Sequence, residues 1–115
     1  MNDVARPDRR ALMELEAVLG EIERLRDSGS RTQFDDDGMF RWALHRLWIA
    51  AGNEALRYAV ALGRPLSAPH MWVDLYRHRN ALAHLSLPEI DDDAVWRMTV
   101  LRTAGYRAQA RALLH

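Results

Sequence analysis

The chain contains no cysteine and no lysine, and it lacks any long apolar run. Without cysteine there is no disulfide, no zinc–thiolate site and no cysteine nucleophile. No apolar run approaches the roughly 18 residues that span a membrane, and the first residues lack the apolar segment of a secretory signal peptide. These absences favour a cytoplasmic protein that makes no contact with a membrane.

Because lysine is absent, arginine is the only residue type counted as basic. All sixteen basic residues are arginine, and sixteen acidic residues balance them to a formal net charge of zero. A zero net charge argues against a general nucleic-acid binder with a basic surface. The arginine bias has two readings that stay open together: a genome rich in arginine codons, and the use of guanidinium groups to bind phosphate.

Nearly half of the 115 residues are apolar, which is enough for one domain with a small hydrophobic core. No run of residues suggests a strand. The pattern predicts an all-α fold, an antiparallel four-helix bundle in a single domain of residues 1–115. We expect helices over about 7–27, 37–62, 67–86 and 92–114, with a loop at 30–35.

Three of the expected helices carry apolar stripes that recur at helical spacing. The first stripe consists of Leu12, Leu15, Leu19 and Ile22. The second has near-heptad spacing and consists of Phe40, Leu44, Leu47, Ala51, Ala55, Tyr58 and Leu62. The last consists of Met98, Leu101, Gly105, Ala108 and Ala112.

Short polar motifs mark where the expected helices begin. The acidic triplets 35–37 and 91–93 precede apolar runs, and negative charge is favourable at a helix N-terminus. We interpret both as caps and not as metal sites. Ser67 offers an N-cap for the third helix, with Pro69 in its first turn. Gly52 in mid-helix costs roughly 1 kcal/mol against alanine, which indicates that another helix packs closely there.

The third helix holds the densest group of side chains able to bind phosphate and move protons: Arg77, His78, Arg79, Asn80 and His84. Asn80 and His84 are four residues apart and therefore neighbours on a helix. Arg79 and His84 are five apart, which separates them by roughly 140°. The long arginine side chain, an unwound helix end or a second copy of the chain would have to close that gap.

The positions of the remaining histidines and of the tryptophans along the expected helices indicate structural roles for them. His78 falls on the apolar face of its helix, which predicts a core or interface residue. We expect His45 and His70 at the surface. Tryptophans at helical spacing are typical of a core and not of platforms for base stacking, and the four are Trp42, Trp48, Trp72 and Trp96.

The run Arg79-Asn80-Ala-Leu-Ala-His84 is an R-x4-H motif with a polar residue directly after the arginine. It resembles the active-site motif of the HEPN superfamily, and its flanks are similar to those of the HepT-like ribonuclease toxins. Upstream, the run Gly52-Asn53-Glu54-Ala55 resembles the Ile-Gly-Glu-Ala phrase that ends the second helix of that family. The resemblance covers nearly the whole chain.

The resemblance implies an endoribonuclease that needs no metal and no cofactor. His84 would serve in proton transfer as the ribose 2′-hydroxyl attacks the adjacent phosphorus. Arg79 would hold the scissile phosphate and stabilise its charge in the transition state. Asn80 would orient the imidazole or bind phosphate, and Arg77 would bind the RNA backbone.

The resemblance also implies a homodimer and an antitoxin of the minimal nucleotidyltransferase type. In that family the antitoxin modifies a tyrosine two residues after the histidine, where this chain has Ser86. Tyr76 is the nearest substitute hydroxyl. Glu54 matches the glutamate of the family's phrase, and its two readings, a pair with Arg79 and a solvated carboxylate, stay open.

Two other functions are alternatives to that of a ribonuclease toxin. In one, a HEPN domain without catalysis serves as a nucleotide- or protein-binding subunit of a nucleotidyltransferase partner. In the other, the chain is a helical interaction module in which Arg77, Arg79 and His84 bind acidic groups of a partner.

Overall fold

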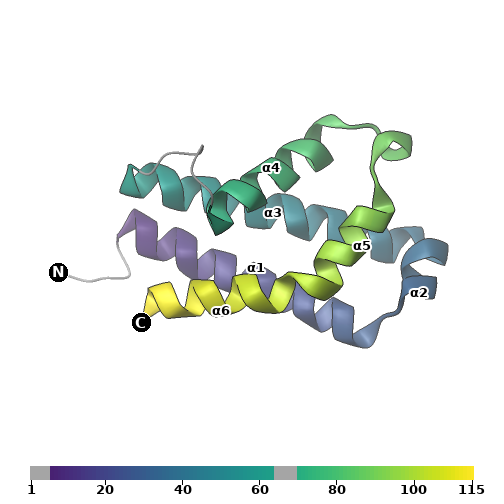
Figure 1. Cartoon of the computed structure of the whole chain (residues 1–115), viewed down its shortest axis with the longest axis horizontal. Helices are drawn as coiled ribbons and strands as arrows, with labels where there is room; N and C mark the ends of the chain where they lie inside the picture. Colours follow the sequence, from purple (N-terminus) through teal and green to yellow (C-terminus); the bar gives the residue numbers. More distant parts are fainter. Residues whose placement is uncertain (1–5, 64–69) are drawn as a thin grey trace.

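The structure, a computed structural model, describes residues 6–63 and 70–115. All regular elements in these ranges are helical, which confirms the predicted all-α class. The elements are α1 (Pro7–Ser28), α2 (Arg31–Asp36), α3 (Gly38–Leu62), α4 (Met71–His84), the 3-10 turn η2 (Leu87–Glu89), α5 (Asp92–Leu101) and α6 (Thr103–Leu114) (Figure 1). Of these described helices, none has the length and apolar character to cross a membrane.

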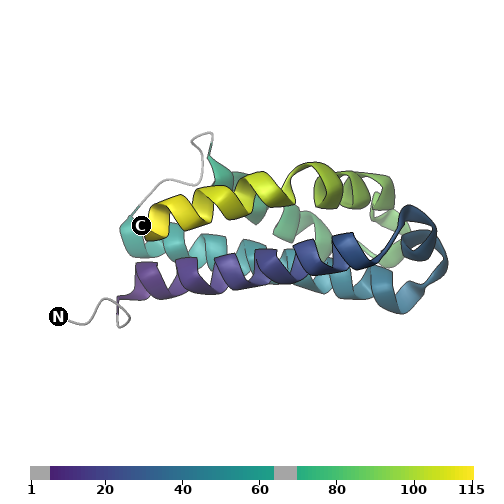
Figure 2. The same ribbon diagram turned by 90° about the horizontal axis from the view of Figure 1, so that it is seen from below.

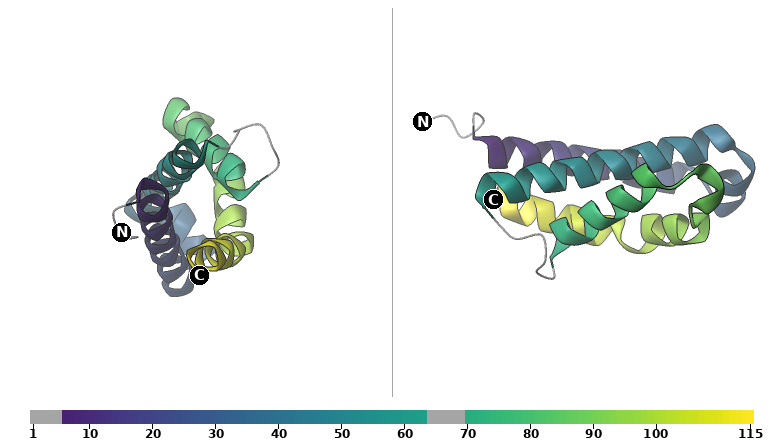
Figure 3. Two further views of the ribbon diagram at one scale, coloured as in Figure 1. Left: turned by 90° about the vertical axis from the view of Figure 1, so that its left-hand side faces the viewer. Right: turned by 90° about the horizontal axis from the view of Figure 1, so that it is seen from above.

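The longest helix, α3, lies between α1 and α4 and packs against both (Figure 1). α6 packs along the other side of α1, as Figure 2 shows from below. Successive long elements run in opposite directions, so that the helices form an antiparallel bundle (Figures 1 and 3). The start of α1 and the end of α6 meet at one end, where Arg9 Nη1 donates to the carbonyl of Leu114 over 2.9 Å.

Local sequence signals place the ends of α1 and α3 close to where we expected them. The Asp37 carboxylate accepts hydrogen bonds from the backbone N–H groups of Met39 and Phe40, and so caps α3. Gly63 ends α3 in the left-handed conformation, with φ 65°, which glycine adopts without strain. Asp91 caps α5 in the same way through the N–H of Ala94. Both acidic triplets therefore supply caps.

The expected loop at 30–35 is wrong, because a short helix forms there. The Ser30 hydroxyl accepts a hydrogen bond from the backbone N–H of Gln33 and caps α2. Phe34 is fully buried against the bundle. Burial of this one aromatic ring holds a segment whose other residues are exposed.

The expected last helix is broken at Arg102 into α5 and α6. Thr99 and Thr103 each donate their hydroxyl to the carbonyl four residues earlier, at 2.8 and 2.7 Å, an arrangement that bends helices. The predicted stripe is therefore wrong beyond Met98, and Leu101 is 68% exposed. The buried stripe consists of Val95, Met98, Thr99, Thr103, Tyr106 and Ala110.

The motif helix α4 begins at Met71, with His70 at its N-cap position. The caps that we expected at Ser67 and Pro69 lie outside the described residues. α4 ends at His84, two residues before the expected limit at 86.

Candidate functional site

Gly52 sets the distance between α3 and α4, and so the position of the motif. A Cβ atom at this residue would lie 2.6 Å from the carbonyl oxygen of Leu75 and would also meet the side chain of Arg79. The close helix packing inferred from the mid-helix glycine is confirmed. It brings the start of the Arg79 side chain directly onto the surface of α3.

Two neutral amides hold the guanidinium group of Arg79. Its Nε donates to Oδ1 of Asn53 over 2.8 Å, and its Nη1 donates to Oδ1 of Asn80 over 2.9 Å. None of the ion pairs found among the described residues includes Arg79, although its side chain is half-buried. The group is therefore oriented without being neutralised, and its full charge is available to an anion.

Asn53 is a site residue that the sequence analysis missed. The neighbouring Glu54 pairs instead with Arg57 and lines a groove between α1 and α3, so it does not pair with Arg79. The sequence feature that could have identified Asn53 is its position directly after Gly52. A residue that follows the point of closest contact between two helices lies near the facing helix.

His84 lies apart from Arg79. α4 is continuous from Met71 to His84, so the roughly 140° separation of an ideal helix holds. His84 is exposed at the end of the helix, and Arg77 is exposed one heptad earlier on the same side. The structure thus brings Arg79, Asn80 and Asn53 together. Arg77 and His84 are exposed and lie away from Arg79, with Asn80 between the two sides of α4.

The two hydroxyls named as supporting residues differ in their surroundings. Ser86 is exposed, and both its hydroxyl and its backbone N–H donate to the carboxylate of Glu89. These hydrogen bonds, that from the hydroxyl first, hold the pKa of Glu89 below its usual value. Tyr76 is half-buried on α4. Ser86 therefore has a structural role at the start of η2.

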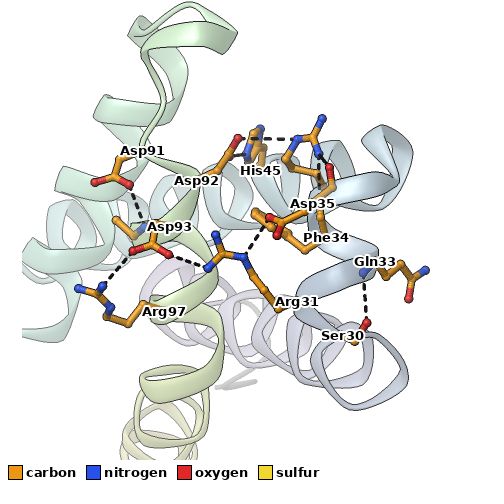
Figure 4. Close-up of polar contacts among 12 residues, drawn as sticks. Ser30, Arg31, Gln33, Phe34, Asp35, His45, Asp91, Asp92, Asp93 and Arg97 are labelled. Atoms are coloured by element: carbon orange, nitrogen blue, oxygen red, sulfur yellow. Dashed lines mark hydrogen bonds and ion pairs between the residues drawn. The ribbon is translucent and has the colours of Figure 1, made fainter.

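Aspartates of both acidic triplets form ion pairs with arginines at the junction of α2, α3 and α5 (Figure 4). Arg31 bridges Asp35 and Asp93 at 2.9 and 2.6 Å, and the bond from Arg31 is the main cause of a lowered pKa of Asp93. Asp92 lies 2.7 Å from Nε2 of His45. In the part of the chain that the structure describes, no three histidine or acidic side chains are grouped to hold a metal ion.

Two of the predicted positions are wrong. His45 is buried and not at the surface, because the ring of Phe34 packs edge-on against it and Asp92 supplies a polar partner. Trp42 is 53% exposed, whereas Trp48 and Trp72 are buried as expected. His70 is exposed as expected and stacks on Trp72, with ring centroids 3.2 Å apart.

A second hollow, of about 350 Å³, lies between α4 and the α5–α6 pair. Asp74, His78, Arg102 and Tyr106 line it. Burial lowers the pKa of His78 although the charge of Asp74 opposes the shift, and burial, with Asp74, raises the pKa of Tyr106. No local pattern in the sequence groups these residues, because the grouping depends on how α4 faces α6.

Comparisons of the chain with protein-family models, with curated proteins and with solved structures found no match. The resemblance to the HEPN superfamily therefore rests on the motif residues and their flanks in the sequence.

Proposed function

We propose that the chain is a metal-independent endoribonuclease and the toxin of a toxin–antitoxin pair. The observation that carries this proposal is the guanidinium of Arg79, which two amides orient and no described carboxylate neutralises. A fixed, permanently charged fork suits a phosphodiester in the transition state. Asn53 and Asn80 act on the reaction by positioning that group.

In the proposed reaction, an imidazole takes the proton of the ribose 2′-hydroxyl and the oxygen attacks the adjacent phosphorus. The bond to the 5′-oxygen breaks, and that oxygen leaves with a proton from a second group. The products are a 2′,3′-cyclic phosphate and a 5′-hydroxyl. His84, exposed at the end of α4, is the proton-transfer group, and proton transfer by such a group typically contributes 10²- to 10⁴-fold.

A second copy of the chain would complete this site. α4 does not unwind before His84, and Arg79 is held on α3, so neither the helix end nor the arginine closes the gap within one chain. A two-fold dimer would place Arg79 of one copy beside His84 of the other at each of two sites. The HEPN resemblance implies the same arrangement.

The separation of Arg79 from His84 also favours a second candidate function. A catalytically inactive domain that binds a nucleotide or protein for a nucleotidyltransferase partner needs Arg79 alone. Arg77, which is exposed, would extend the anion-binding surface in either case.

Digestion of end-labelled RNA by the purified chain in EDTA tests the nuclease. We expect cleavage that leaves 2′,3′-cyclic phosphate ends and that is lost in both Arg79→Ala and His84→Ala at unchanged melting temperature. RNA or nucleotide binding without cleavage would select the second candidate. Activity that disappears with EDTA and returns with magnesium would contradict the mechanism.

We propose a nucleotidyltransferase-type antitoxin as the protein partner. Because the hydroxyl of Ser86 is short and donates to Glu89, we expect inhibition by tight binding, or modification elsewhere, with the half-buried Tyr76 the nearest alternative. Mass spectrometry of the chain co-expressed with its antitoxin checks this. AMP on Ser86 would contradict it.

A further inference from the structure

The N-terminal part of α3 exposes a large apolar surface. Trp42 is 53% exposed and Met39, three residues before it, is 76% exposed. The guanidinium of Arg46 lies over the indole ring of Trp42, 5.7 Å from its centroid. An exposed indole with an arginine over one ring is a feature that folding does not require, and clustered exposed apolar groups mark binding surfaces.

This pair lies on the same side of α3 as the partner of Arg79. Trp42 and Asn53 are eleven residues apart on an uninterrupted helix. Eleven residues make three full turns plus about 20°, so the two residues face nearly the same direction and lie roughly 16 Å apart along the helix axis. Arg46 and Ile49 lie between them on the same stripe. Because Asn53 binds Arg79, one face of α3 carries an exposed aromatic ring at one end and a fixed guanidinium at the other.

The charge on this face is not compensated. Neither Arg46 nor Arg79 takes part in an ion pair among the described residues, whereas Arg41, on another side of the same helix, pairs with Asp92. A row of unneutralised cations beside an exposed aromatic ring is the combination that binds single-stranded nucleic acid, through its phosphates and its bases respectively.

We propose that Trp42 and Arg46 form a stacking platform for a base of single-stranded RNA whose backbone continues along α3 to Arg79. The proposal rests on the proposed function for its substrate class, but it concerns binding away from the cleaved bond. RNA fits this face better than a second copy of the chain, because phosphates neutralise the guanidinium groups. A two-fold copy seated over Trp42 and Arg46 would bring the Arg46 guanidinium groups of the two copies together.

Fluorescence anisotropy with a labelled single-stranded RNA tests the platform in a His84→Ala background, which prevents cleavage. Stacking on one aromatic ring predicts an affinity loss of about 5- to 150-fold for Trp42→Ala. Trp42→Phe keeps a stacking ring and retains most of the affinity. Leu101→Ala is the matched control, because Leu101 is a large apolar residue on α5 that is even more exposed than Trp42, and it leaves the affinity unchanged.

The outcomes separate this proposal from the nuclease itself. Unchanged RNA affinity in Trp42→Ala, with cleavage intact when His84 is present, overturns the platform and leaves the nuclease standing. Absence of both RNA binding and cleavage in the wild-type chain overturns both. Light scattering that shows Trp42→Ala to be a monomer where the wild type is a dimer overturns the platform, because the face is then a subunit interface.

Discussion

The half-buried arginines of the described chain differ in what holds their guanidinium groups. Arg26, Arg41 and Arg107 pair with carboxylates, and Arg9 donates to a backbone carbonyl. Arg79 instead donates to two side-chain amides. A carboxylate stabilises an arginine but cancels its charge, whereas an amide orients it and leaves the charge in place. This difference separates a structural arginine from one that can bind phosphate.

Replacing the amide of Asn53 by a carboxylate tests this distinction. In Asn53→Asp the hydrogen bond to Arg79 remains, but the added negative charge opposes phosphate. We expect RNA affinity to fall at least about tenfold, or about 1.4 kcal/mol, without loss of stability. Filter binding in the His84→Ala background measures it.

Gln33→Glu is the control for this variant, because it makes the same charge change at an exposed residue of α2. Equal affinity losses in both variants would show a general charge effect. An unchanged affinity in Asn53→Asp would return Arg79 to a structural role.

The contact between α3 and α4 is the element on which the site depends. Both helices approach at Gly52, where the facing atoms belong to the backbone at Leu75 and to the first carbons of Arg79. Backbone atoms of a packed helix do not move aside singly, so an added methyl group must displace α4 as a whole. Displacement of α4 would also move the guanidinium away from Asn53.

Gly52→Ala is therefore expected to destabilise the fold by about 1–3 kcal/mol and to lower RNA cleavage more than the lost stability explains. Gly105→Ala is the matched control, because a Cβ atom there meets nothing within 4 Å. It should be neutral or stabilising by about 0.5–1 kcal/mol, the usual gain of alanine over glycine within a helix. Urea denaturation followed by circular dichroism measures both, and equal effects of the two substitutions would contradict the close packing.

The stability of the whole chain depends on pH through His78 and through the acidic groups. Burial lowers the pKa of His78 from 6.5, so the folded state disfavours its proton. The unfolded state then binds more protons, and stability falls as pH falls below 6.5. The lowered carboxyl pKa values of Glu16 and Asp93 act in the same direction, but in the window below their usual 4.5 and 3.8.

Because the two windows begin at different pH values, a substitution can separate them. We expect His78→Gln to remove a loss of stability that the wild type shows just below pH 6.5 and to leave the acid transition of the carboxylates in place. Thermal melts from pH 8 to pH 3 check this, with His84→Gln as a control at an exposed histidine. Identical pH profiles for wild type and His78→Gln would contradict the burial of this imidazole.

The proposed dimer is a prediction about the whole assembly. Arg79→Ala and His84→Ala subunits, each inactive, should recover cleavage when mixed and allowed to exchange, because one site of the mixed dimer keeps both groups. Random exchange gives about half mixed dimers, each with one intact site of two, so about a quarter of wild-type activity is expected. An active protein that remains monomeric in light scattering would rule the shared site out.

Local sequence signals were sufficient for the long helices. The apolar period of α1 and the Asp37 cap of α3 act within a few residues of one chain segment. The all-helical class and these limits follow because each signal changes the energy of its own turn, whatever packs nearby. The R-x4-H motif was visible for the same reason.

Contacts between segments set the rest. Thr99 and Thr103 are polar, yet they are buried because their hydroxyls bond within the helix and Thr99 also accepts from the indole N–H of Trp48. His45 is buried because Asp92 reaches it from α5. Asn53 binds Arg79 because Gly52 lets α4 approach. The free energy of burying a polar group depends on a partner that is distant in sequence, so no local pattern could predict which of these residues the fold would enclose.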